Sequence, residues 1–279
     1  GQARSGVGDL ERSESFGQKR LTFRAPEGDS LALVEDPNDK RLPWTGGEVG
    51  GDEAIRGFHS ASLRLRDAGA TEELRRWLDG HFPRSAGYDT YKIVFSPLVA
   101  YNQSVTWLES NGFKELQPHV NFPYAEDLKR HGSALTLSPE GEIIFRGNIV
   151  FTEMNHGYIN PEADKYADRI TRAVSNRAYW VEDRYGDDYY PGMATFNEYM
   201  NWGLVSLRIM DHAPEKDREQ MIAAVEKMMV ESRAFPQFAE FDKFLINLYF
   251  NRESGKTLAD LFPKIIDWFE ARNAASAAQ

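Results

Sequence analysis

The stretch NIVFTEMNHGYINP, residues 148–161, decides how this sequence is interpreted. Projected at about 100° per residue, Thr152, Glu153 and His156 fall within one quadrant of a helix. The opposite side carries larger apolar residues, Phe151, Met154 and Tyr158. We therefore predict a helix near 148–159 in which three polar side chains address one common point.

Glu153 and His156 have the spacing of the zinc-peptidase motif His-Glu-x-x-His. In that motif two His four residues apart bind zinc from one helix face, and the Glu after the first His is the general base. Thr152 stands where the first His would be, and a Thr hydroxyl is a poor substitute for an imidazole ligand. Three alternatives follow: His119 or His131 completes the site, Glu153 becomes a ligand in a Glu-x-x-His pair, or the site holds no metal.

Glu198 lies on a second predicted helix, 195–211, within MATFNEYMNWGLVSLRIMD. That helix is apolar nearly all round, so we expect it to be buried. A buried carboxylate is costly unless a cation, a metal or strong hydrogen-bond donors accompany it. Glu198 is therefore the candidate third ligand, and a salt bridge to Arg208 or to a lysine is the alternative. For Glu153 and His156 the alternative is an ordinary charge-assisted hydrogen bond one turn apart.

The segment TEMNHGYINPEADKY, residues 152–166, resembles a bacterial family of zincin-like domains of unknown function, in which the helix reads HExxHxxxNP. The resemblance covers residues 80–279 and includes YKIVFSPL and the closing LADLFPKIIDWFEARN. It implies a zincin-like fold and a zinc-dependent, peptidase-like hydrolase. The roles implied are a general base at Glu153, zinc ligands at His156 and Glu198, and a lost first ligand at Thr152.

Further segments are candidates for a substrate cleft. Asn155 and Tyr158 lie on the predicted helix, and Asn102 lies in SPLVAYNQS, residues 96–104. The resemblance implies that 96–104 edges the cleft, where a strand edge can pair with an extended peptide. The acidic and aromatic segment WVEDRYGDDYYPG, residues 180–192, has two interpretations. It either rims the cleft and binds a cation or a sugar-like ligand, or it is a solvated loop pinned by its tyrosines.

The N-terminal residues differ in character. KRLTFRAPEGDSLALVED, residues 19–36, predicts a hairpin, and the Gly- and Pro-rich residues 36–53 predict a linker. Residues 6–78 resemble part of the vicinal-oxygen-chelate superfamily, the glyoxalase-like ring-cleaving dioxygenases. That family binds a metal through a strand-opening His and a last-strand Glu, but these positions fall at Ser60, next to His59, and at Ala32. We interpret the segment as a structural remnant or a fusion, without dioxygenase activity.

The remaining pattern predicts an α+β protein: a β-rich segment over 1–78 and a mainly helical zincin-like domain with a small sheet over 79–279. AIRGFHSASLRLRD (54–67) is expected to form a strand, AGATEELRRWLDGHF a short helix, and YDTYKIVFSPLVAY and LQPHVNFPY strands. LTLSPEGEIIF, residues 135–145, reads as a hairpin turning at Pro139–Gly141. Helices are predicted near 162–178, 215–231, 237–250 and 257–273 as well.

Composition narrows the partners. The chain has 43 acidic and 33 basic residues, a net charge of −10, and no cluster of Lys and Arg, which argues against a nucleic-acid partner. With no cysteine, any metal must be bound by His, Asp or Glu. No apolar run is long enough to span a bilayer, no leader is visible, and both a secreted or periplasmic and a cytoplasmic location remain open.

These observations predict a metallohydrolase-related, peptidase-like protein with a degenerate zinc site, acting on a peptide or a small molecule. A non-catalytic binding or scaffold protein on the same fold is the alternative. A glyoxalase-like dioxygenase is the second alternative, carried by residues 6–78 only. No serine-hydrolase or phosphate-loop motif supports another chemistry.

Overall fold

The computed structural model describes residues 8–15, 17–24, 30–44, 50–51, 54–56, 69–83, 85, 87–96, 99, 103–121, 135–186 and 188–276. The protein is α+β and forms two compact units, Gly1–Ser62 and Leu63–Gln279. The division predicted from the sequence lies at residue 78, whereas these units divide after residue 62, so the short helix predicted over residues 68–82 lies in the second unit. Within the described residues, no helix combines the length and apolar character needed to cross a membrane.

The first unit is a three-stranded antiparallel sheet in the order β1-β2-β3. Its strands are β1 Gly8–Ser15, β2 Gln18–Arg24 and β3 Ser30–Val34. The hairpin predicted over 19–36 is confirmed by β2 and β3, whereas β1 was not predicted. Ala32 lies on β3 opposite Thr22, and His59 and Ser60 lie outside the described residues, as does most of the strand predicted over 54–67.

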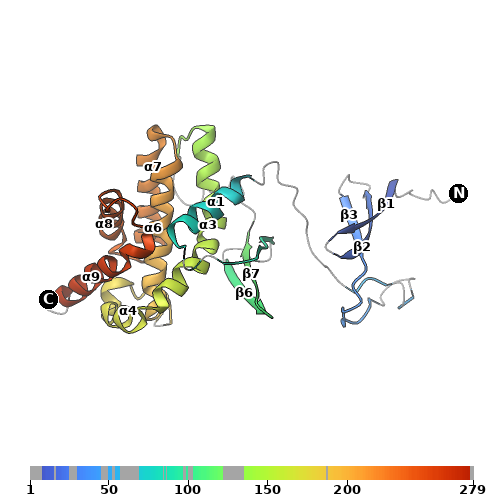
Figure 1. Cartoon of the computed structure of the whole chain (residues 1–279), viewed down its shortest axis with the longest axis horizontal. Helices are drawn as coiled ribbons and strands as arrows, with labels where there is room; N and C mark the ends of the chain where they lie inside the picture. Colours follow the sequence, from blue (N-terminus) through green and yellow to red (C-terminus); the bar gives the residue numbers. More distant parts are fainter. Residues whose placement is uncertain are drawn as a thin grey trace. The chain divides into compact units, whose positions relative to one another are not determined.

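The second unit is mainly helical, with a small mixed sheet (Figure 1). Its helices are α1 Gly69–His81, α3 Pro139–Asp164, α4 Ala167–Ala173, α5 Arg177–Trp180, α6 Met193–His212, α7 Glu215–Lys227, α8 Phe238–Phe250 and α9 Leu258–Ser276, with a π-helical turn η2 at Met228–Ser232. Its strands are β4 Thr90–Tyr91, β5 Val94–Phe95, β6 Ser104–Ser110 and β7 Phe113–Val120. Strands β4 and β5 pair with β7 in parallel, and β6 pairs with it antiparallel.

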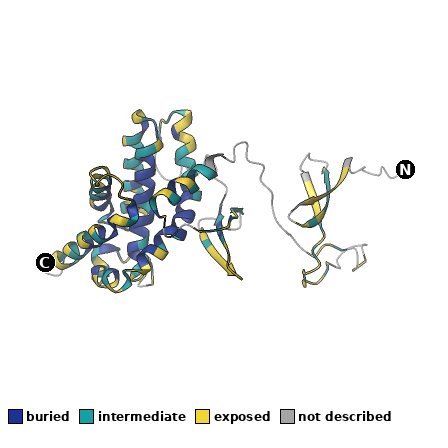
Figure 2. Cartoon of the chain, in the orientation of Figure 1, coloured by how far each residue is buried: buried dark blue, intermediate teal, exposed yellow. Residues whose placement is uncertain are grey.

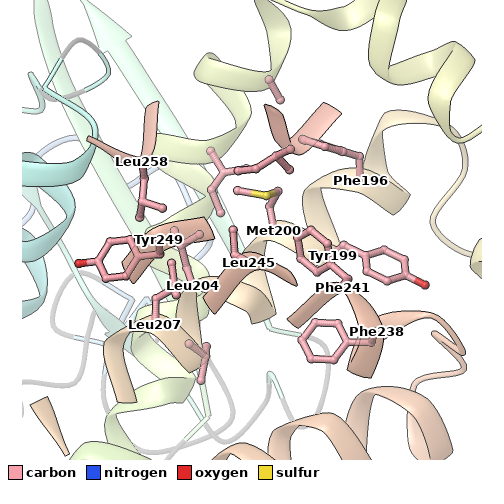
Figure 3. Close-up of a cluster of buried hydrophobic side chains, with 14 of the residues drawn as sticks. Phe196, Tyr199, Met200, Leu204, Leu207, Phe238, Phe241, Leu245, Tyr249 and Leu258 are labelled. Carbon is pink, nitrogen blue, oxygen red and sulfur yellow. The ribbon is translucent and has the colours of Figure 1, made fainter. Parts of the chain in front are cut away.

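Helix α6 runs through the core of this unit, and Figure 2 shows its largely buried surface beside α3. The core is aromatic: Figure 3 shows Tyr199 and Met200 of α6 packed with Phe241 and Leu245 of α8. Gly203 allows this close approach, because a Cβ atom there would lie 2.6 Å from Leu245 Cδ2. The mostly apolar sequence of α6 therefore produces the buried helix that was predicted.

The sheet packs on α3 at the turn that contains the candidate site. A Cβ atom at Gly157 would lie 2.8 Å from Leu116 Cδ2 of β7, so only glycine lets the strand approach the helix this closely. The Tyr88 hydroxyl also donates to the Gly157 carbonyl at 3.0 Å. One residue before this contact, His156 faces a different neighbour, helix α6.

The hairpin predicted over 135–145 is wrong, because α3 begins at Pro139. Ser138 is the N-cap: its hydroxyl accepts from the Gly141 backbone N–H at 3.3 Å and is itself held by buried Asp217 of α7. Pro at the first helical position lacks only an N–H that the helix does not use. Ser-Pro-Glu-Gly therefore starts a helix here. The same helix continues past Pro161 to Asp164, and the helix predicted over 162–178 is divided into α4 and α5.

Candidate functional site

The pairing of α3 with α6 brings together the three residues that the sequence singles out. Glu153 and His156 lie on α3, and Glu198 lies on the facing side of α6. His156 Nε2 is 3.8 Å from Glu198 Oε2, beyond ordinary hydrogen-bond distance. Glu153 and Glu198 are both buried, and so are Asn155 and Asn201, which join the same two helices, so a polar cluster lies inside the helix interface.

Glu198 is paired with an arginine that sequence reasoning missed. The Arg233 guanidinium donates from its Nη2 atom to Glu198 Oε1 at 2.5 Å, and the Trp202 indole N–H donates to the same oxygen at 3.1 Å. The predicted alternative, a salt bridge at Glu198, is therefore confirmed, but its partner is Arg233 and not Arg208 or a lysine. Arg208 instead donates to the Ile144 carbonyl at 3.1 Å and to the Asn148 side chain at 3.3 Å.

Arg233 is held by an irregular backbone. It directly follows the π-helical turn η2, and its backbone N–H donates to the Met228 carbonyl at 3.0 Å. The next residue, Ala234, has φ +65°, a left-handed conformation that is unusual outside glycine. π-Helical turns and such strained residues are frequent at functional sites. The backbone thus pays a conformational cost to direct Arg233 at Glu198.

Two aromatic rings flank the guanidinium. Its Cζ atom lies 5.4 Å from the Trp202 ring centre and 5.6 Å from that of Tyr190, and its Nη2 atom donates to the Tyr190 hydroxyl at 2.7 Å. Burial is the largest single influence and opposes the charged form of Arg233, but Glu198 together with Tyr190 and Tyr189 outweighs it, so the pKa of Arg233 is raised. The cation is therefore permanent, stabilised by one carboxylate and two aromatic faces.

His156 is fixed by a chain of asparagine amides. Asn155 Nδ2 donates to Asn201 Oδ1 at 3.2 Å, which leaves Asn201 Nδ2 to donate to His156 Nε2 at 3.1 Å. His156 Nδ1 is 3.4 Å from Asn160 Oδ1 and is the donor in this arrangement. The Nε2 lone pair, which a zinc ion would need, therefore already accepts a hydrogen bond.

Glu153 is buried without a compensating hydrogen bond from the described residues. Burial raises the pKa of Glu153 to about 8; the negative charge of Glu198 adds to the increase and Arg233 opposes it. At neutral pH this carboxyl group is therefore mainly protonated. A protonated carboxyl donates a proton and does not accept one, so in this state Glu153 cannot act as a general base.

The other candidate residues are distributed around α3. Thr152, at the first ligand position, donates its hydroxyl to the Ile149 carbonyl of its own helix at 3.1 Å. Tyr158 points away from the cluster and donates to Asp79 of α1 at 2.7 Å. His119 lies on β7, opposite Val94 and Ser104 of its neighbouring strands. Asn102 and His131 lie outside the described residues.

The described residues thus provide a pair, His156 and Glu198, without the third ligand that zinc requires. Among them, no group of three or more His, Asp or Glu side chains is placed to hold a metal ion. A metal at this pair would have to displace the Asn201 amide from His156 and would sit beside the positive charge of Arg233. The donor set as arranged does not fit zinc.

The aromatic loop 180–192 is pinned to the segment that carries Arg233. The Tyr185 hydroxyl donates to the Ser232 carbonyl at 2.7 Å, and the Tyr189 hydroxyl donates to the Arg233 carbonyl at 3.2 Å. Tyr190, which accepts from Arg233, has φ +47° and is, like Ala234, in a left-handed conformation. Of the two interpretations of this loop, pinning by tyrosines is confirmed. The same contacts place the loop next to Arg233, which belongs to the polar cluster.

Comparisons with protein-family models, with curated proteins and with solved structures found no match to this chain.

Proposed function

We propose that this protein is a metal-independent binding protein on a helix pair of the kind that carries zinc in peptidases. One observation carries the proposal: N–H donors of Arg233 and Asn201 already bond Glu198 Oε1 and His156 Nε2, the two groups expected to bind zinc. Of the functions considered from the sequence, the non-catalytic binding protein is favoured over the metallohydrolase.

Electrostatics supports a site without a metal. Arg233 balances the ionised Glu198, while Glu153 is mainly protonated at neutral pH. A divalent cation would add two charges next to an arginine in a poorly solvated place, where repulsion is strong. The cluster as it stands is close to neutral.

A neutral cluster suits an uncharged polar ligand. The His156 side chain is 19% exposed and that of Arg233 27% exposed, so these two groups reach solvent from a buried network. The partly buried rings of Tyr190 and Trp202 lie beside Arg233. Hydrogen-bonding groups next to aromatic faces are typical of sites for peptide amides or other small polar molecules. We therefore assign the ligand to the class of uncharged, peptide-like molecules.

Zinc titration by calorimetry tests the metal-independent character. We expect no stoichiometric zinc binding by the native protein or by Thr152→His, because Arg233 remains in place. The double variant Thr152→His with Arg233→Met should acquire zinc binding, since it gains an imidazole and frees Glu198, and three ligands then suffice for zinc to displace the Asn201 amide from His156. Stoichiometric zinc binding by the native protein that is lost in His156→Ala would instead support the metallohydrolase.

The ligand class is tested separately. The Trp202 indole N–H donates to Glu198, so its nuclear magnetic resonance signal reports on the cluster, and Trp202→Phe identifies that signal. An acetylated and amidated tripeptide containing one aromatic residue should shift it in a saturable way, and His156→Ala should weaken the effect about tenfold. Zinc-dependent hydrolysis of the same peptide, abolished in Glu153→Gln, would contradict the proposal.

A further inference from the structure

A second candidate site lies at the other end of α6, where α1 ends and α8 connects to α9. A surface cleft of about 400 Å³ opens there. Its lining consists of the end of α1, the end of α8 and the connecting loop, namely Gly80, His81, Phe250, Arg252, Glu253, Ser254, Gly255, Lys256 and Thr257. None of these residues belongs to the cluster around Glu198.

Arg252 is held rigidly at this cleft. Its guanidinium Cζ lies 3.9 Å from the ring centre of Tyr249, its Nη1 donates to the Tyr249 carbonyl at 2.5 Å and its Nε donates to the Lys256 carbonyl at 3.0 Å. These bonds use two of the five N–H donors of the guanidinium. The cation is therefore fixed in position with donors remaining for a further acceptor.

Lys256 adds a second positive charge. Among the described residues, neither Lys256 nor Arg252 forms an ion pair with an acidic side chain. This is notable in a chain with 43 acidic residues against 33 basic ones. Glu253 is the one acidic residue of the lining, so the cleft carries a net positive charge within an acidic protein.

The wall behind Arg252 is a partly buried hydrogen-bonded network. The Tyr249 hydroxyl donates to Asp211 Oδ2 at 2.7 Å and is 3.1 Å from His81 Nε2, while the Trp77 indole N–H donates to the same Asp211 oxygen at 2.8 Å. Asp211 thus fixes the ring on which Arg252 stacks. A fixed cation binds an anion at a smaller entropic cost than a mobile one.

The remaining lining indicates what kind of molecule fits. The Phe250 side chain is 50% exposed at the edge of the cleft and offers an aromatic face. The start of α9 is already bonded internally, because Asp260 accepts from the Thr257 N–H at 2.9 Å and from its hydroxyl at 3.0 Å. Recognition therefore rests on the two cations and the aromatic ring.

We propose that this cleft binds a small molecule that carries an oxyanion group, a phosphate or a carboxylate, between Arg252 and Lys256 and places an aromatic or apolar part on Phe250. The arginine fork and the lysine ammonium are the standard partners of both oxyanions. The site is independent of the cluster on α3 and α6.

Calorimetric titration of the full chain with phenyl phosphate, inorganic phosphate and benzoate tests the assignment. We expect saturable binding of phenyl phosphate at low ionic strength that weakens with added salt. Tighter binding of phenyl phosphate than of benzoate identifies a phosphate, and the reverse order identifies a carboxylate; both support an oxyanion site. Absence of saturable binding by all three probes would overturn the proposal.

Two variants locate the binding. Lys256→Ala should weaken every bound probe about tenfold, and its exposed side chain makes no contact that the fold needs. Phe250→Ala should weaken phenyl phosphate and leave inorganic phosphate unchanged. Lys264→Ala is the matched control, because Lys264 is an exposed lysine on α9 outside the cleft. An equal loss in Lys264→Ala would show that the binding is nonspecific and would refute the site.

Discussion

The Arg233 guanidinium donates to Glu198 Oε1 across 2.5 Å, so the carboxylate expected to bind a metal carries an organic cation instead. Thirty-five residues separate the two in sequence, and the π-helical turn before Arg233 directs it toward α6. This ion pair explains how α6 can bury a carboxylate among apolar side chains. In the function we propose, it also takes the place of the metal at Glu198.

Removing the cation should destabilise the fold strongly. Arg233→Met leaves Glu198 buried and unpaired, and the expected loss is about 3–5 kcal/mol of unfolding free energy, measured by urea denaturation. Adding Glu198→Gln should recover a large part of that loss. Arg146→Met is the control, because its pair with Glu142 at 3.3 Å is exposed and should contribute less than about 1 kcal/mol. Equal losses in both single variants would contradict a buried role for Arg233.

The protonation of Glu153 predicts a pH dependence. Its folded-state pKa, about 8, lies above the ordinary value of 4.5, so its contribution to stability is intact below pH 4.5 and is lost as the pH rises toward 8. Glu153→Gln should therefore gain stability relative to the native protein across this range, by on the order of 4 kcal/mol at its upper end. Urea denaturation at both ends of the range measures the difference. A difference that does not change with pH would show that Glu153 is ionised in the folded protein.

Asp242 of α8 should behave in the same direction without any link to the site. It is completely buried, burial raises its pKa well above the ordinary value, and Ser206 of α6 offsets only part of that increase. Above neutral pH, Asp242→Asn should therefore increase the unfolding free energy by roughly 1–3 kcal/mol and raise the melting temperature accordingly. In acid it should have little effect on either. The exposed Asp164→Asn should leave it nearly unchanged at both pH values. A lower melting temperature for Asp242→Asn in alkaline buffer would mean that the carboxylate has an essential partner.

The contact between α6 and α8 sets a limit on side-chain size. Gly203→Ala would place a Cβ atom 2.6 Å from Leu245 and 3.0 Å from Phe241, which should cost about 1–3 kcal/mol through overpacking. Gly80→Ala is the matched control, since a Cβ atom there meets nothing within 4 Å inside α1. It should instead stabilise the protein by about 0.5–1 kcal/mol. Thermal denaturation of both variants distinguishes a packing effect from a general effect of removing a helical glycine.

Sequence periodicity predicted the long C-terminal helices to within three residues at each end, because α6, α8 and α9 each bury a wide apolar face. It failed at the start of α3, where Ser138 and Pro139 cap a helix through Asp217, a residue distant in sequence. A local pattern does not contain that contact, and Pro-Glu-Gly alone favours a turn.

The candidate site was predictable only in part, because a local sequence pattern does not contain contacts between residues that are distant in sequence. The shared face of Glu153 and His156 follows from helical geometry, and a buried Glu198 predicted a compensating cation, metal or set of strong hydrogen-bond donors. That the partner is Arg233 did not follow, because Arg233 is a single residue in the segment ESRAFP, residues 231–236, at the end of the π-helical turn η2. Asn201, which lies 45 residues from His156, likewise becomes its partner only through the packing of α3 against α6.

The ring nitrogens of His156 provide the most direct test of the central claim that hydrogen bonds and an arginine have replaced the metal. Nitrogen-15 spectra of the histidines, with His156→Ala to identify the signals, report which ring nitrogen carries the proton. We predict a proton on Nδ1 above neutral pH and no change on addition of equimolar zinc, because Asn201 occupies Nε2. A zinc-dependent shift of Nε2 that disappears in Glu198→Gln would contradict the account.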